Sequence, residues 1–170
     1  MANNEQLGYI KQGVDVWNRW RDENPDITPE LSEADLRGAK LQKANLKGVN
    51  LMEAKLQFAN LTGADLEGAN LKKAKLQETN LQSANLRKAN LKSANLLESN
   101  MQNTDLTNAD LQKAQFNEDV LFFQTNLRGA NLEKATGLNS GQIQAALTDG
   151  TTKLPEYLEE EQDDDFLMQM

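Results

Sequence analysis

The sequence predicts an all-β solenoid, a narrow tube wound from short extended segments that are joined by tight corners. Leucine recurs at every fifth residue, alanine stands two positions before it, and asparagine or aspartate lies between the two. Seventeen such units run from 34 to 118 without a spacing error, and Met101 and Phe116 are the only replacements at the leucine position. A period of five fits neither an α-helix, which needs about 3.6, nor a continuous strand, which needs about 2.

Each unit supplies one extended segment and one corner. Alanine and leucine are two apart, so they point to one side of an extended backbone, while the residue between them points to the other. The last two residues of the unit must turn the chain. Glycine recurs at the second of them, where a turn with positive φ favours it. Repetition stacks the coils about 4.8 Å apart, with leucine and alanine inside and polar residues outside.

The units ADLRG, ANLKG, ANLTG, ADLEG and ANLRK, which lie within 34–135, resemble the A(D/N)LXX repeats of the pentapeptide-repeat family. The resemblance implies a right-handed quadrilateral β-helix with about four units, or roughly twenty residues, per turn, and therefore about five coils here. The flanking segments, Trp17 to Pro25 and Ala135 to Pro155, are similar to those of small cyanobacterial members.

The two ends of such a tube are open sheet edges that need cover. Residues 5–22 predict one amphipathic capping helix whose apolar face includes Trp17, with Trp20 at its edge. A second short helix is expected from Asn139 or Ser140 through Leu147, with Ile143 and Leu147 facing the last coil. The predicted organisation is a capping helix and lead-in (1–30), the β-helix (31–137), a capping helix and extended segment (138–158), and a disordered acidic tail (159–170).

The repeat loses its register once, near its C-terminal end. Leu127 is eleven residues from Phe116 instead of ten, so one residue is inserted near 117–119. Leu121 and Phe123 then point outward. We expect residues 154–158 to fold back over them; the alternative is that a dimer or a partner protein covers them.

Composition excludes several function classes. The chain has no Cys and no His, which excludes disulfides, thiolate nucleophiles, Cys/His zinc sites and imidazole-based triads. No phosphate loop and no lid insertion interrupts the repeat. The first residues lack the basic and apolar segments of a secretory signal, and no apolar run approaches the ~20 residues of a membrane span. We expect a cytoplasmic protein with no enzymatic activity, no cofactor, no metal and no membrane contact.

Charge is distributed unevenly along the chain. The net charge is −8, yet residues 34–135 hold fourteen Lys or Arg and eleven Asp or Glu, whereas 149–165 hold eight carboxylates and one lysine. A twenty-residue coil would gather charges into corner columns. The basic column is Lys72, Lys73, Lys92, Lys113 and Lys134, and the acidic column is Glu78, Glu98 and Glu118. Either is a solvated face or a partner-binding stripe; few Arg and no interleaved aromatics argue against nucleic acid.

The sequence therefore predicts a rigid protein–protein interaction scaffold with an unidentified protein partner, as a monomer rather than a dimer. The alternative is a DNA-mimicking inhibitor or protector of DNA gyrase, a role of some members of the family. The near-neutral to basic repeat body disfavours that alternative. The candidate interaction surface is Phe58, Glu78, Leu97, Glu98, Glu118, Leu121 and Phe123.

Overall fold

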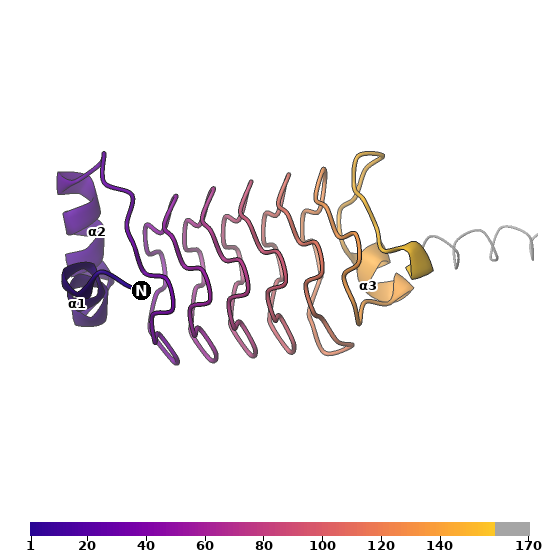
Figure 1. Cartoon of the computed structure of the whole chain (residues 1–170). Helices are drawn as coiled ribbons and strands as arrows, with labels where there is room; N and C mark the ends of the chain where they lie inside the picture. Colours follow the sequence, from indigo (N-terminus) through magenta and orange to yellow (C-terminus); the bar gives the residue numbers. More distant parts are fainter. Residues whose placement is uncertain (159–170) are drawn as a thin grey trace, which may run out of the picture.

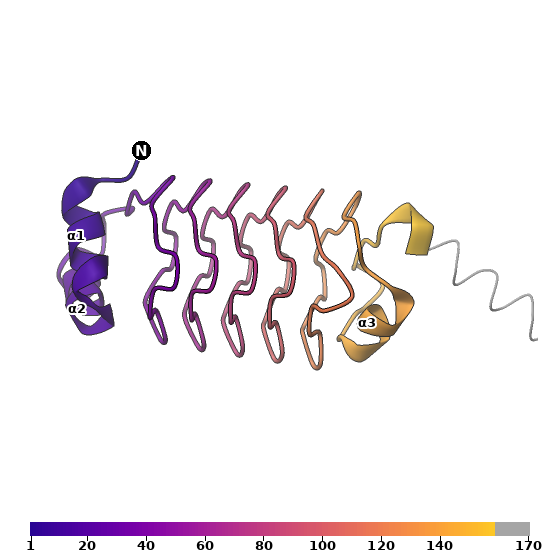
Figure 2. The same cartoon turned by 90° about the horizontal axis from the view of Figure 1, so that it is seen from below.

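The computed structural model describes residues 1–158, and the predicted acidic tail over 159–170 lies outside the described part. The chain forms a rod of stacked coils with helices at both ends (Figure 1). α1 (Asn4–Gln12) and α2 (Val14–Glu23) lie across one end, and α3 (Ser140–Ala145) lies at the other. Figure 2 shows the same order along the rod after a quarter turn.

Parallel bridges hold the coils together. They join residues twenty apart, from Glu30–Asn50 to Asn95–Gln115, and from Asp35 to Gln115 each bridge lies at the outward position of the repeat unit, directly before the leucine position. Four such positions follow one another before the ladder repeats, so a coil has four sides. The leucine and alanine positions are buried, and Leu86 is 0% exposed. The structure therefore has the predicted tube, with the leucine and alanine side chains inside.

The corners share one backbone geometry. At every corner except the one at 117–120, the N–H of the alanine position donates to the preceding carbonyl of the leucine position, as from Ala89 to Leu86 at 3.1 Å. The second corner residue has positive φ, as a type II turn requires. Glycine holds this position at only some corners, and Lys, Glu, Ser, Asn, Gln and Phe hold it at the others. Stacking between coils therefore imposes a conformation that most of these side chains disfavour.

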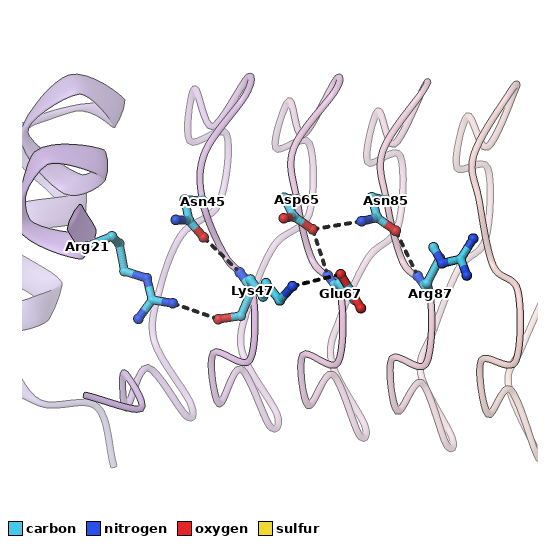
Figure 3. A network of polar contacts seen from close by, with 7 residues as sticks. All are labelled: Arg21, Asn45, Lys47, Asp65, Glu67, Asn85 and Arg87. Carbon is cyan, nitrogen blue, oxygen red and sulfur yellow. Dashed lines mark hydrogen bonds and ion pairs between the residues drawn. The ribbon is translucent and has the colours of Figure 1, made fainter. Parts of the chain in front are cut away.

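Asparagine and aspartate at the outward position brace the corner that follows them. In Figure 3 the Asp65 carboxylate accepts the Glu67 N–H at 3.1 Å, and Asn85 accepts the Arg87 N–H at 3.2 Å. The Asn85 amide also donates to Asp65 on the previous coil at 2.9 Å. One side chain thus closes a local turn and joins two coils, which explains why the repeat uses Asn or Asp here.

The N-terminal helix predicted over 5–22 is in fact two helices. Gly13 has a φ of 127° and ends α1 while α2 begins at the next residue. The break lets both helices lie across the first coil. Trp17 is completely buried and donates from its indole N–H to the Asn45 carbonyl at 2.8 Å. Trp20 is half-buried and packs against the rings of Trp17 and Tyr9, with centroids 5.2 and 5.5 Å away.

Polar side chains of α2 occupy the sheet edge of the first coil. The Asn18 amide accepts the Asn45 N–H at 2.8 Å and donates to the Lys43 carbonyl at 3.1 Å. Arg21 donates to the Lys47 carbonyl at 2.9 Å, as Figure 3 shows. Lys47 in turn pairs with Glu67 at 2.9 Å, so the ion pair raises the pKa of Lys47 and lowers that of Glu67. These contacts satisfy groups that an open edge would expose.

The C-terminal helix is shorter than predicted. Asn139 is its N-cap and forms a capping box with Gln142, but the helix ends at Ala145. Ile143 is buried, as expected. Leu147 does not belong to the helix: it is half-buried and forms a parallel bridge with Asn126. Its backbone bonds Thr125 and Leu127 at 2.8 Å each, so residues after α3 extend the ladder, which continues to Lys153.

Candidate interaction surface

The irregular turn at 117–120 sets the candidate surface. The bridges join residues twenty apart up to Asn95–Gln115 and twenty-one apart from Asn100–Leu121 to Asn126–Leu147, and the last bridge, Asn131–Lys153, spans twenty-two. The Asn117–Val120 turn alone, among the corners from 33 to 134, lacks the positive φ. Val120 and Phe122 return to the interior at 2% and 3% exposure. The extra residue therefore changes only this one turn. The alternation of inward and outward side chains resumes after it.

Three residues far apart in sequence support this turn. The Asn117 side-chain oxygen accepts the Glu98 N–H at 2.9 Å. Gln142 of α3 donates to the Asn117 and Val120 carbonyls at 2.8 and 3.1 Å. Gly137 lies against the Phe116 carbonyl, where a Cβ would overlap the oxygen. The insertion, α3 and the start of the last coil thus form one bonded unit.

The insertion leaves two large apolar side chains on the surface. Leu121 is 46% exposed and Phe123 is 60% exposed. Leu121 bridges to Asn100 and the Phe123 carbonyl accepts the Asn103 N–H, so both continue columns that are polar on earlier coils. The prediction that residues 154–158 cover them is wrong. Pro155 and Leu158 are buried, but this segment lies near Leu138 instead. There the Tyr157 hydroxyl accepts the Leu138 N–H.

The remaining candidates share one neighbouring corner. Phe58 donates its N–H to the Gln77 carbonyl, and Glu78 donates its N–H to the Leu97 carbonyl at 3.0 Å. Phe58 is 61% exposed, Leu97 is half-buried, and both Glu78 and Glu98 are exposed. Within the described residues, the buried side-chain oxygens of Gln57 and Gln77 at this corner accept no hydrogen bond.

The predicted acidic column changes at the insertion. Glu78 and Glu98 are second corner residues with positive φ. Glu118 is exposed, but it is the first corner residue of the irregular turn, and Asp119 takes the second position. The side of the rod next to this corner holds Leu121, and its far edge holds Phe123. Five of the seven predicted residues thus share one corner, Leu121 lies on the adjoining side and Phe123 begins the next corner; we call these seven residues the candidate surface.

The candidate surface combines exposed apolar groups with exposed carboxylates. Among residues 1–158, no group of acidic side chains is arranged to hold a metal ion. No described helix is both long enough and apolar enough to cross a bilayer.

Sequence reasoning missed Asn117, Gln142 and Gly137 as determinants of this surface. Gln142 had a readable local signal, because it lies at the third helical position after an Asn N-cap, where a Gln completes a capping box. Its contact with a turn twenty-five residues earlier had none. Gly137 stands just after the last repeat, and only the approach of Phe116 explains it.

Comparisons with known proteins agree with this architecture. The sequence profile for pentapeptide repeats matches in eight copies, over residues 30–68, 50–87, 64–99 and 84–118, which span more than half of the chain. A crystal structure of a pentapeptide repeat protein from the Arabidopsis thaliana thylakoid lumen is 25% identical, with a TM-score of 0.63, over 69% of this chain and 85% of that one. No curated protein sequence matches the chain.

Two other solved structures are also similar. The pentapeptide repeat protein Rfr23 from the cyanobacterium Cyanothece 51142 is 34% identical over 64% of this chain and 65% of that one, with a TM-score of 0.28. QnrB1, a plasmid-mediated fluoroquinolone resistance protein, is 16% identical over 72% and 80%, with a TM-score of 0.38. The repeat, its ladder and the profile match together show that this chain belongs to the pentapeptide-repeat family, whose members form right-handed quadrilateral β-helices.

Proposed function

We propose that this protein is a non-enzymatic scaffold that binds a partner protein through the candidate surface. The observation that carries the proposal is the exposure of Leu121 and Phe123, at 46% and 60%, on a turn that the chain supports from three separate segments. Aromatic side chains such as that of Phe123 are enriched at protein interfaces, where a few anchor residues carry most of the binding energy.

The surroundings of these anchors favour a basic partner. Glu98, Glu118 and Asp119 are exposed near them, so a partner with Lys or Arg around an apolar segment would be attracted and oriented. Surfaces that combine an apolar centre with a charged rim are typical of specific interfaces.

The rod suits this role because its shape is preorganised. In the proposal it comprises about five coils closed by α1 and α2 at one end and by α3 at the other, and it acts as a monomer in the cytoplasm. Each coil is tied to its neighbours by bridges on every side. Binding therefore orders little of the scaffold, and this preserves affinity.

The test is to remove the anchors while restoring the repeat. Leu121→Asn and Phe123→Gln together install the residue types of Asn100 and Gln102 in the same columns. Affinity capture from the native source, quantified by mass spectrometry, should retain a basic partner with the wild-type protein and lose it with this double variant.

A matched control changes the same columns at the other end of the rod. Lys40→Asn with Thr62→Gln should leave capture unchanged. Equal capture by the anchor variant and the wild type, with both proteins folded, would exclude Leu121 and Phe123 as the contact.

A further inference from the structure

A second charged feature lies at another corner of the rod and takes no part in the candidate surface. We call it the lysine column: Lys72, Lys73, Lys92, Lys113 and Lys134. The structure stacks these residues, because the Lys73 N–H donates to the Lys92 carbonyl at 2.8 Å and the Lys113 N–H donates to the Glu133 carbonyl at 3.1 Å.

Much of this positive charge is unpaired within residues 1–158. Lys73 pairs with Glu53 at 3.2 Å and Lys92 pairs with Asp110 at 3.0 Å. Lys113 and Lys134, which are both exposed, have no carboxylate within ion-pair distance in the described part of the chain. Like charges that stack at strand spacing repel one another, so an anionic segment along the column would be stabilising.

The described chain ends beside this column. Residues 134–136 and 155–157 line one depression at the C-terminal end of the rod. Leu158, the last described residue, is 1% exposed and is tied to Pro155 by a backbone hydrogen bond of 3.0 Å. The next seven residues, 159–165, carry six carboxylates and no positive charge.

We infer that this acidic segment, 159–165, binds back along the lysine column of the same molecule. The reach fits: Lys134 and Lys73 are three coils apart, about 14 Å at strand spacing, and seven extended residues span about 23 Å. Exposed ion pairs are individually weak. Tethering raises the effective concentration of the segment to the order of millimolar, so that several weak pairs suffice.

The chain allows a direct test because it has no cysteine. A nitroxide attached to Leu167→Cys reports the position of the segment by broadening nearby amide signals in NMR spectra. Lys73 and Ser83 lie at different corners of one coil. Docking should reduce the Lys73 signal at least about twofold relative to Ser83 at low salt, and about 0.5 M NaCl should abolish the difference.

Charge reversal supplies the matched variants. Lys113→Glu with Lys134→Glu should remove the selective broadening at Lys73. Lys43→Glu with Lys88→Glu makes the same charge change at the same turn position on other corners, and should preserve it. Broadening of Lys73 and Ser83 to the same extent, or its survival after reversal of Lys113 and Lys134, would overturn the inference.

A mixed sample distinguishes docking within one molecule from docking between two molecules. Isotope-labelled protein without the nitroxide is combined with unlabelled protein that carries it. The intramolecular assignment expects no selective broadening in this mixture. Broadening of Lys73 there would instead place the segment of one molecule on the column of another and would overturn the inference as stated.

Discussion

At the corners, the surroundings of each single residue determine which substitutions the fold tolerates. A non-glycine residue in the left-handed region costs roughly 1–2 kcal/mol, yet Lys88 and Lys113 adopt it with φ near 60°. The bonds that stack one corner on the next offset this cost. For Lys88 that bond runs from its N–H to the Thr107 carbonyl at 3.0 Å. Positive φ alone therefore does not require glycine in this fold, whereas close approach of another coil does.

Gly137 is the clearest case. Gly137→Ala should reduce the free energy of unfolding by about 1–3 kcal/mol or more, because the new Cβ overlaps the Phe116 carbonyl. Gly48→Ala also has positive φ but meets open space, so it should cost about 1 kcal/mol. Urea denaturation of both variants measures the difference. Equal losses of stability would show that φ, and not crowding, dominates at Gly137.

Asp35 makes a testable electrostatic contact with Arg37. Hydrogen bonding from Arg37 lowers the pKa of Asp35 from its ordinary value to about 2. Because this pKa is lower in the folded state, the contact stabilises the protein above the unfolded-state pKa of about 3.9 and loses its effect as the pH falls to about 2. Carboxyl ¹³C NMR should show this midpoint, and Arg37→Gln should raise it.

A matched control is available at the same position of a distant unit. Arg128, like Arg37, follows a leucine of the repeat. Arg128→Gln should leave the Asp35 titration unchanged. A midpoint for wild-type Asp35 near 4 would contradict the ion pair that joins it to Arg37 at 2.6 Å.

Among the helices, α3 both covers the end of the rod and supports the inserted turn. It lies at the end of the rod, and its Gln142 side chain completes both the capping box and the carbonyl contacts of the inserted turn. The helix has only six residues, too few to persist alone in water. Its stability therefore comes from docking, and the turn and the helix should lose their structure together.

Gln142→Ala tests this coupling. It removes hydrogen bonds to the Asn117 and Val120 carbonyls and should cost about 1–3 kcal/mol. Gln144→Ala, an exposed position of the same helix, should stay within about 0.5 kcal/mol. Hydrogen exchange gives a local measure: the Glu98 amide, bound to the Asn117 side chain, should exchange faster only in the Gln142 variant. Unchanged Glu98 protection would separate the helix from the turn.

The whole molecule is stabilised along one dimension, since each coil contacts chiefly the coils before and after it. A cavity in a central coil weakens two interfaces at once. Leu86→Ala should therefore cost roughly 2–5 kcal/mol, because Leu86 is completely buried. Lys88→Ala, on the exposed corner of the same unit, should stay within about 0.5 kcal/mol. Thermal melts compare the two, and similar shifts would refute the assignment of inside and outside.

The charge of the rod bears on the alternative function. Residues 34–135 carry three more positive than negative charges, whereas DNA mimicry needs an acidic rod. An excess of the protein should leave supercoiling by DNA gyrase unchanged. The same assay with an established pentapeptide-repeat gyrase inhibitor serves as the positive control. Clear inhibition by this protein would favour the gyrase role over the scaffold.

Prediction from sequence succeeded where contacts repeat and failed where they are unique. The buried positions of Leu86, Val120 and Phe122 follow from the five-residue repeat, because every unit presents the same two positions to the interior. The division of the first helix at Gly13 was not predicted, since glycine also occurs within helices and only docking on the first coil requires the break. Leu147 was misplaced because its apolar spacing fits a helix, while its ladder contacts with Thr125 and Leu127 prevail.

The sequence by itself determined the interior, the corners and the family, because a five-residue period allows one arrangement that buries every leucine. The tertiary structure decided what the surface presents. Whether Leu121 and Phe123 are covered depends on where residues 154–158 pack, and whether the inserted turn holds its shape depends on Gln142 and Gly137. Those contacts join segments about twenty residues apart and occur once. A periodic pattern encodes only what repeats, so the unique contacts that distinguish this rod from others had to be seen in three dimensions.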